Sequence, residues 1–129
     1  VTEVKINLVP CPTMTSLSVV HFQDIFGASE AVKDILEHSP SSIEIMDQNV
    51  LERSRASTGL GSNLSFIEGN PGAMLVVEFY GETEQELQSK MDNLKSDMSR
   101  KGTGMHVLIS WINLLKVVFG RFVRMDWVC

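Results

Sequence analysis

Short apolar and β-branched runs, bounded by Pro, Gly and Ser, predict the strands of this chain. In the first run Val4, Ile6 and Leu8 alternate with polar residues, which is the period of a half-buried strand. The strongest run is Ala73–Tyr80. The predicted strands cover residues 2–9, 16–22, 42–46 and 73–80, and residues 106–111 are a candidate for one more.

Apolar residues spaced three and four apart predict the helices. Asp24 is the expected N-cap of the first, whose apolar stripe is Ala28, Ala31, Val32, Ile35 and Leu36. Asp47 is expected to cap a short helix over residues 48–55, with Val50 and Leu51 pointing inward.

Thr83 and Glu86 have the spacing of a capping box and predict the start of the last helix, which ends at Lys101-Gly102. Its apolar stripe consists of Leu87, Met91, Leu94 and Met98. From residue 16 the order is thus strand, helix, strand, short helix and loop, strand, helix, possible strand. This is the split-βαβ order, so we predict an α+β, ferredoxin-like fold whose antiparallel sheet carries helices on one face.

Composition narrows the function classes. The chain has 129 residues, which suits one domain, and a net charge of −5, which argues against a nucleic-acid partner. Its two cysteines, Cys11 and Cys129, lie near opposite ends and fit a reducing compartment. The first residues have neither the basic nor the apolar region of a signal peptide, so we expect a cytoplasmic protein.

The charge is unevenly distributed along the chain. Residues 1–104 carry 15 acidic and 8 basic side chains, a net charge of −7. Residues 105–129 have a net charge of +2, and 17 of these 25 residues are apolar. Polar residues interrupt this tail too often for a membrane span. An amphipathic segment that binds a partner is the remaining alternative.

The residues that could carry chemistry have simpler structural interpretations. Gly59-Leu60-Gly61-Ser62 follows no strong strand, so a surface loop is favoured over a phosphate-binding loop. Glu44 and Asp47 could form an acid–base pair, but a capping aspartate beside an exposed strand glutamate is favoured. None of the histidines has a cysteine or carboxylate at metal-ligand spacing. We therefore predict neither a metal site nor catalytic residues.

Two segments resemble a known family. Val1–Pro10 is similar to the closing strand of the FAD-binding domain in FAD-linked oxidases of the glycolate oxidase and D-lactate dehydrogenase type. Ser42–Asp47, followed by Val50-Leu51-Glu52, resembles the Glu-x-Met-Asp segment of their C-terminal substrate domain, and Leu75–Phe79 follows in the family's order. The resemblance divides the chain into residues 1–10, the last strand of the upstream FAD-binding domain, and 11–104, the first half of a two-half substrate domain.

Residues 105–129 depart from the family pattern. When the tail from Phe119 is back-translated and read one nucleotide upstream, it gives a Trp-Ala-Leu-Arg-Lys-like run of the family. We interpret residues 105–129 as family sequence translated out of frame.

The resemblance implies a parent enzyme that oxidises a small D-2-hydroxy acid with FAD and passes the electrons to an acceptor. Val1 and Thr2 match the strand that touches the flavin, and they are the only residues for which it implies a cofactor contact. Because the rest of the FAD site is missing, we expect this chain alone to bind no flavin and to be inactive. We also expect a homo-oligomer formed through exposed apolar faces or the tail. The alternative is a free-standing ferredoxin-like module that binds a small molecule or regulates another protein, and that self-associates.

Overall fold

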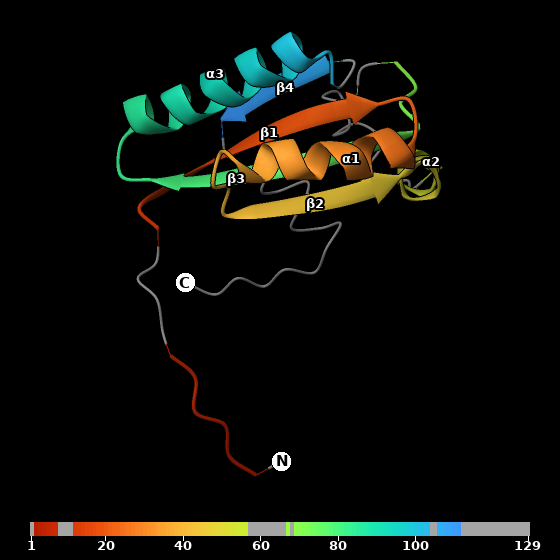
Figure 1. Cartoon of the computed structure of the whole chain (residues 1–129). Helices are drawn as coiled ribbons and strands as arrows, with labels where there is room; N and C mark the ends of the chain where they lie inside the picture. The colour runs from red at the N-terminus through yellow and green to blue at the C-terminus, as the bar shows by residue number, and fades with distance from the viewer. Residues whose placement is uncertain (1, 8–11, 57–66, 68, 104–105, 112–129) are drawn as a thin grey trace.

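The computed structural model describes residues 2–7, 12–56, 67, 69–103 and 106–111, with only the backbone for the last range. Its elements are β1 (Met14–Phe22), α1 (Ile25–Leu36), β2 (Ser42–Asp47), α2 (Gln48–Ala56), β3 (Ala73–Gly81), α3 (Glu84–Lys101) and β4 (His106–Trp111) (Figure 1). The predicted helices and the predicted strands from residue 16 onward are therefore confirmed, including β4. β1 begins two residues earlier than predicted, at Met14.

The four strands form one antiparallel sheet in the order β2-β3-β1-β4. Because β3 pairs with both β1 and β2, it lies between the two parallel strands that α1 connects. In the same way, β1 separates β3 from β4, which α3 connects. Both βαβ units are therefore split, which confirms the α+β, ferredoxin-like plan.

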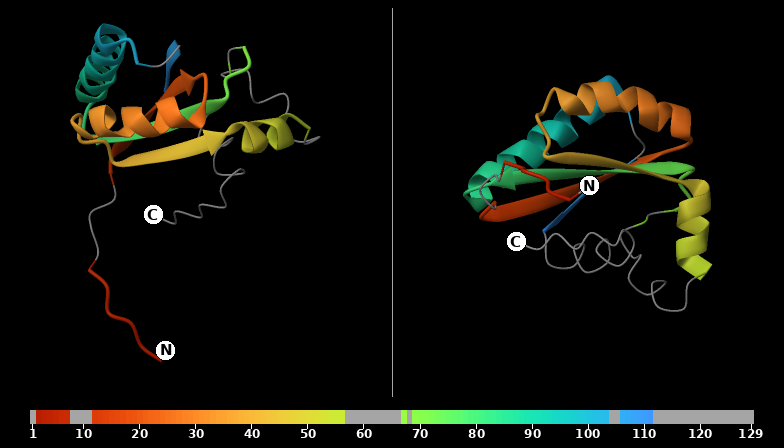
Figure 2. Two further views of the ribbon diagram at one scale, coloured as in Figure 1. Left: turned by 45° about the vertical axis from the view of Figure 1, so that its right-hand side comes forward. Right: turned by 90° about the horizontal axis from the view of Figure 1, so that it is seen from below.

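Helices α1 and α3 lie side by side on one face of the sheet (Figure 2). Alternate residues of β1 and β3 point to this face, and all four residues of the predicted α3 stripe are fully buried there. The core beneath the two helices comprises Val20, Phe22, Ala28, Ala31, Ile35, Ala73, Leu75, Val77, Phe79, Leu87, Met91, Leu94 and Met98. This core joins the helices to the central strands.

The opposite face of β1 and β3 is also buried. Its apolar cluster comprises Leu17, Val19, Met46, Leu51, Met74 and Val76, with Ile67 packed against it. Burial on both sides explains why β3 is a continuous apolar run rather than an alternating one. Leu51 belongs to α2, so the prediction of helices on one face holds for α1 and α3 but not for α2.

The inward face of α2 differs from the predicted one. Leu51 is buried as predicted, but Val50 is 40% exposed and Ser54 is buried instead. Adjacent residues lie about 100° apart around a helix. Ser54, three positions after Leu51, therefore lies closer to the face of Leu51 than Val50 does. The Ser54 hydroxyl donates a hydrogen bond to the Val50 carbonyl at 2.6 Å, which satisfies it within the helix.

The helix ends have the predicted caps. Asp24 Oδ1 accepts a hydrogen bond from the Gly27 amide at 2.8 Å, and Thr83 Oγ1 accepts one from the Glu86 amide at 3.2 Å. The Glu86 carboxylate reaches the amide of Glu82, one residue before the cap, at 3.0 Å. Gly102 ends α3 with φ of 65°, a left-handed conformation that favours glycine.

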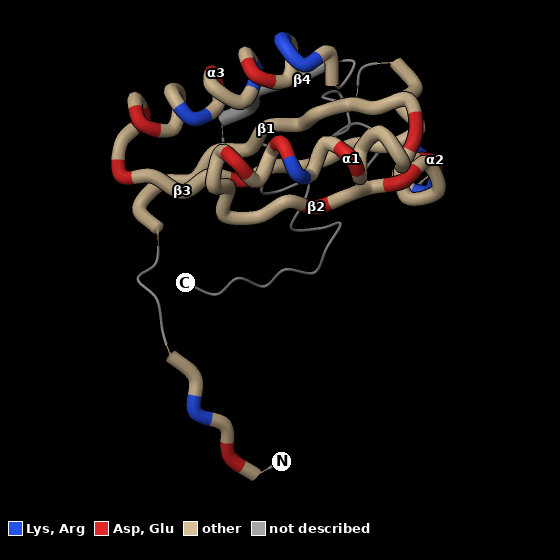
Figure 3. The backbone as a smooth tube through the Cα atoms, viewed as in Figure 1, with Lys and Arg blue, Asp and Glu red and all other residues tan. Residues whose placement is uncertain are grey.

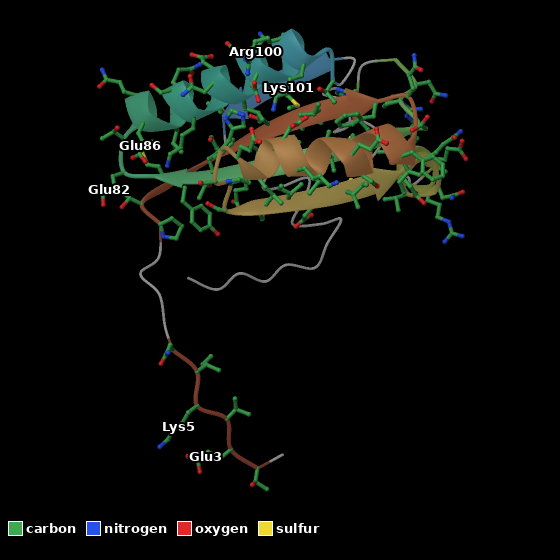
Figure 4. All side chains as sticks on the ribbon, viewed as in Figure 1. Glu3, Lys5, Glu82, Glu86, Arg100 and Lys101 are labelled. Atoms are coloured by element: carbon green, nitrogen blue, oxygen red, sulfur yellow. The ribbon has the colours of Figure 1, made fainter. Side chains whose placement is uncertain are left out.

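Residues 2–7 project away from the domain as an extended segment (Figures 1 and 4). They pair with no strand of the described part of the chain, and Val4 and Ile6 are 70% and 75% exposed. The half-burial predicted for this strand is therefore not present, because no neighbouring sheet covers its apolar side. Among the described residues, no helix combines the length and the apolar character needed to cross a bilayer.

Candidate functional site

Of the two residues for which we predict a flavin contact, the structure describes only Thr2, which is not part of the folded domain. Val1 lies outside the described residues, and Thr2 is exposed in the extended segment. In Figure 4 the neighbouring Glu3 and Lys5 lie far from the helices and the sheet. Within the described part of the chain, nothing brings Thr2 near another candidate residue.

A small polar cluster lies on the sheet face opposite α1 and α3. The register places Ser42 of β2 beside Glu78 of β3, and the Ser42 hydroxyl donates to Glu78 Oε2 at 3.4 Å. Tyr80 points to the same face because it lies two residues farther along β3. Burial, and then the negative charge of Glu78, raise the pKa of the Tyr80 phenol above its ordinary value. The cluster thus places a phenol that stays protonated beside a half-buried carboxylate that accepts hydrogen bonds.

Sequence reasoning did not identify this cluster. The available signal was the i, i+2 spacing of Glu78 and Tyr80, which puts both on one face of a strand. The serine comes from another strand, and only the pairing of β2 with β3 brings it there.

A second cluster joins the C-terminal ends of α1 and α3. Lys101 Nζ contacts Asp34 Oδ1 at 2.8 Å, Asp97 Oδ2 at 3.1 Å and Glu37 Oε2 at 3.3 Å. Asp97 also contacts Arg100 and accepts from His38 Nε2 at 3.2 Å. Figure 3 shows that acidic and basic residues occur together near the C-terminal end of α3 and along α1. The carboxylates that neutralise these cations also connect α1 to α3, which indicates a structural role for the cluster.

The ionisation of this second cluster follows from its contacts. Hydrogen bonds from Arg100, and then from Lys101, hold the pKa of Asp97 far below its usual range. Hydrogen bonding to Asp34, and then to Asp97, raises the pKa of Lys101. Both groups are therefore fully charged near neutral pH.

The Glu44–Asp47 pair is not an acid–base pair. The two side chains point to opposite faces of β2, and Asp47 Oδ1 accepts a hydrogen bond from the Val50 amide at 2.9 Å. This bond lowers the pKa of Asp47. The favoured interpretation, an N-cap for α2, is confirmed.

The remaining candidates do not form a metal site in the described residues. His21 is buried in β1, and His38 is bound to Asp97. No described histidine, cysteine or carboxylate belongs to a group of three that could hold a metal ion. Cys11, Cys129 and the stretch 59–62 lie outside the described residues, as does the side chain of His106.

The helix N-termini offer a test of how well this domain suits the FAD diphosphate. Free amides at a helix N-terminus and nearby cations are favourable sites for such a group. Here Asp24 caps α1, Asp47 caps α2, and α3 begins with Glu84 and Glu86 in its first turn. Carboxylates lie at all three described N-termini and would repel a diphosphate, so these helix ends are unsuited to that part of the cofactor.

Comparison with solved structures finds chains of similar fold. Fourteen chains of solved structures match significantly. Among them is alkyldihydroxyacetonephosphate synthase, with a TM-score of 0.60 and 12% identity, over 88% of this chain but only 23% of that one. At this identity the likeness shows the fold alone. Among curated proteins none matches significantly.

The family model described as FAD linked oxidases, C-terminal domain, matches residues 11–110. The match begins directly after the segment that resembles a strand of the FAD-binding domain. It includes β1 to β3 and all three helices, and it ends within β4. This chain therefore belongs to the family of FAD-linked oxidase C-terminal domains.

Proposed function

We propose that this chain is part of the substrate domain of a flavin-dependent oxidoreductase whose FAD is held by a separate domain. The family match over residues 11–110 carries this proposal. The acidic helix N-termini support the binding of FAD by a separate domain, because they are unsuited to a diphosphate. The cofactor would then bind elsewhere in the whole protein, and this chain alone would neither retain flavin nor catalyse oxidation.

Residues 1–10 would form a strand of that FAD-binding domain. Two observations support this assignment. The family match begins at residue 11, and Val4 and Ile6 alternate with polar residues while being largely exposed. A strand that lacks a sheet in its own domain would complete one in another. Val1 and Thr2, at its start, would contact the flavin there.

For the whole protein we propose oxidation of a small D-2-hydroxy acid, with transfer of the electrons to a further acceptor. The support is the resemblance of Val1–Pro10 and Ser42–Asp47 to the glycolate oxidase and D-lactate dehydrogenase type. The chain spans 23% of the matched synthase, so most of a whole protein of that length lies outside these residues.

The test begins with the gene around the codon for Met105, read in all three frames. We expect the neighbouring frame to continue into family sequence. The whole protein expressed from the frame-restored gene, including the FAD-binding domain that we propose upstream of this chain, should then purify with bound FAD. It should reduce an artificial dye with D-lactate or glycolate, while L-lactate serves as the stereochemical control. If no frame continues the family, or if the restored flavoprotein oxidises neither D-lactate nor glycolate, the substrate proposal is wrong.

The chain as it stands provides the complementary test. After incubation with FAD and desalting, we expect it to show no visible flavin absorbance. Stoichiometric flavin would contradict the proposal that another domain holds the cofactor. A marked rise in melting temperature with a small organic ligand would instead favour the free-standing binding module.

A further inference from the structure

Three exposed apolar side chains of the folded domain lie on the side where β2 and α1 meet, while Phe26, Val50 and Tyr80 are exposed elsewhere. Ile25 and Leu36 of α1 are 40% and 57% exposed, and Ile45 of β2 is 46% exposed. Val32 and Ile43 are half-buried and pack against the core between them. We name these five residues the β2–α1 patch.

Helix geometry explains why this flank of α1 is free. At about 100° per residue, Ile25, Val32 and Leu36 lie on one flank of the buried stripe, and Asp34 lies on the other. The Asp34 flank meets α3 through its ion pair with Lys101. Figures 1 and 2 show α1 lying between α3 and β2. Since the Asp34 flank meets α3, the apolar flank faces away from α3, toward β2.

The edge of the sheet on this side is open in the described residues. β2 lies at the end of the sheet, and its only partner there is β3. Proteins commonly protect such edges with Pro, Lys or a bulge. β2 has the sequence Ser-Ile-Glu-Ile-Met-Asp, which contains neither Pro nor Lys. Its backbone can therefore accept a further antiparallel strand.

We propose that this edge is a two-fold dimer interface, in which β2 pairs with β2 of a second copy and the two α1 flanks pack together. The β2–α1 patch is better suited to bind a second copy of itself than a charged partner. The charged residues of α1 lie off its apolar flank; they are Glu30, Lys33 and Asp34. Ser29 lies at the middle of this flank, and its hydroxyl is satisfied by the Ile25 carbonyl at 2.8 Å.

The charges of β2 select the register. In an antiparallel self-pair, residues on the same face lie opposite each other. A register centred on Glu44 would put two carboxylates in direct opposition, which is destabilising. A register centred on Ile45 places Ile45 against its own copy and Glu44 against Met46 of the other copy. Registers centred on Ile43 or Met46 would pair only residues 42–44 or 45–47 of β2, whereas the register centred on Ile45 pairs residues 43–47. We therefore place the dimer axis at Ile45.

The interface is small. A standard interface uses about 800 Å² of each partner, and the whole chain exposes 8580 Å². The proposed interface uses only a six-residue strand and one flank of a twelve-residue helix. We therefore expect a dissociation constant on the order of micromolar.

Cysteine cross-linking tests the axis directly. Opposed residues of an antiparallel pair have Cα atoms about 4.5–5.5 Å apart, within the range of a disulfide. Ile45→Cys in the full chain, with Cys11→Ser and Cys129→Ser, should form a reducible dimer on mild oxidation. Phe26→Cys in the same background is the control, because Phe26 is 77% exposed but lies off the patch. Equal cross-linking of the two variants, none with Ile45→Cys, or more with Glu44→Cys would overturn the proposal.

Sedimentation of the natural chain provides the second measurement. We expect concentration-dependent dimerisation that Ile45→Lys weakens by about ten-fold or more, since two ammonium groups would meet on the axis. Phe26→Lys makes the same charge change and should leave the dimer intact. Circular dichroism verifies that both variants are folded. A chain that stays monomeric, or a dimer that Ile45→Lys leaves unchanged, would refute the interface.

Discussion

The packing of α3 onto the sheet should provide much of the stability of this domain, and Leu94→Ala tests this. Leu94 is fully buried in the core between α3 and the central strands. The substitution removes three carbon atoms, worth about 2.4 kcal/mol at about 0.8 kcal/mol each. A cavity that only partly collapses adds about 1 kcal/mol. We therefore expect the free energy of unfolding to fall by about 3 kcal/mol.

Urea denaturation followed by circular dichroism measures this loss. Leu36→Ala is the matched control, since it removes the same atoms from a helix of the same layer at a position that is 57% exposed. We expect it to cost less than about 1 kcal/mol. Because the proposed dimer uses Leu36, both variants are compared at concentrations where the chain is monomeric. Equal losses in the two variants, or a loss below about 1 kcal/mol for Leu94→Ala, would refute the assignment of α3 to the core.

Other predictions concern charges and a helix end. Asp97→Asn should destabilise the domain at neutral pH. Because the pKa of Asp97 is lowered on folding, its contribution is complete above about pH 4 and is lost as the pH falls further, so the natural and variant chains should converge in acid. Tyr80 is the only tyrosine, so its ultraviolet titration should show ionisation above the ordinary pKa, and Glu78→Gln should move it partly back. Gly102→Ala should cost about 1 kcal/mol in urea unfolding, because alanine opposes a positive φ.

Each of these has an outcome that would contradict it. A difference between the Asp97 variant and the natural chain that grows in acid would reverse the sign of the linkage. An unchanged Tyr80 titration in Glu78→Gln would show that burial alone raises its pKa. Gly27→Ala is the comparison for Gly102→Ala, because Gly27 has no positive φ and an added Cβ there would make only ordinary van der Waals contacts. A Gly102→Ala variant that is no less stable than the natural chain would contradict the prediction.

Local patterns in the sequence were sufficient for much of the fold. The caps Asp24 and Thr83, the α3 stripe and the β3 run each depend on neighbours within a few residues, and the structure confirms them. The prediction that Val50 points inward was wrong. In a short helix with few apolar residues, tertiary packing determines which face is buried. Residues 2–7 have the period of a strand, but a strand is buried only where another sheet covers it.

What the sequence by itself determined is the set of elements, their order and, through a resemblance, the family. These depend on local spacing and on motifs that can be read along the chain. Only the tertiary structure brought Ser42 to Glu78, Lys101 to Asp34, and Ile45 beside the free flank of α1. Ser42 and Glu78 are 36 residues apart in the sequence, and Lys101 and Asp34 are 67 residues apart. They meet because strand register and the stacking of helices on the sheet are set by burial of the whole core.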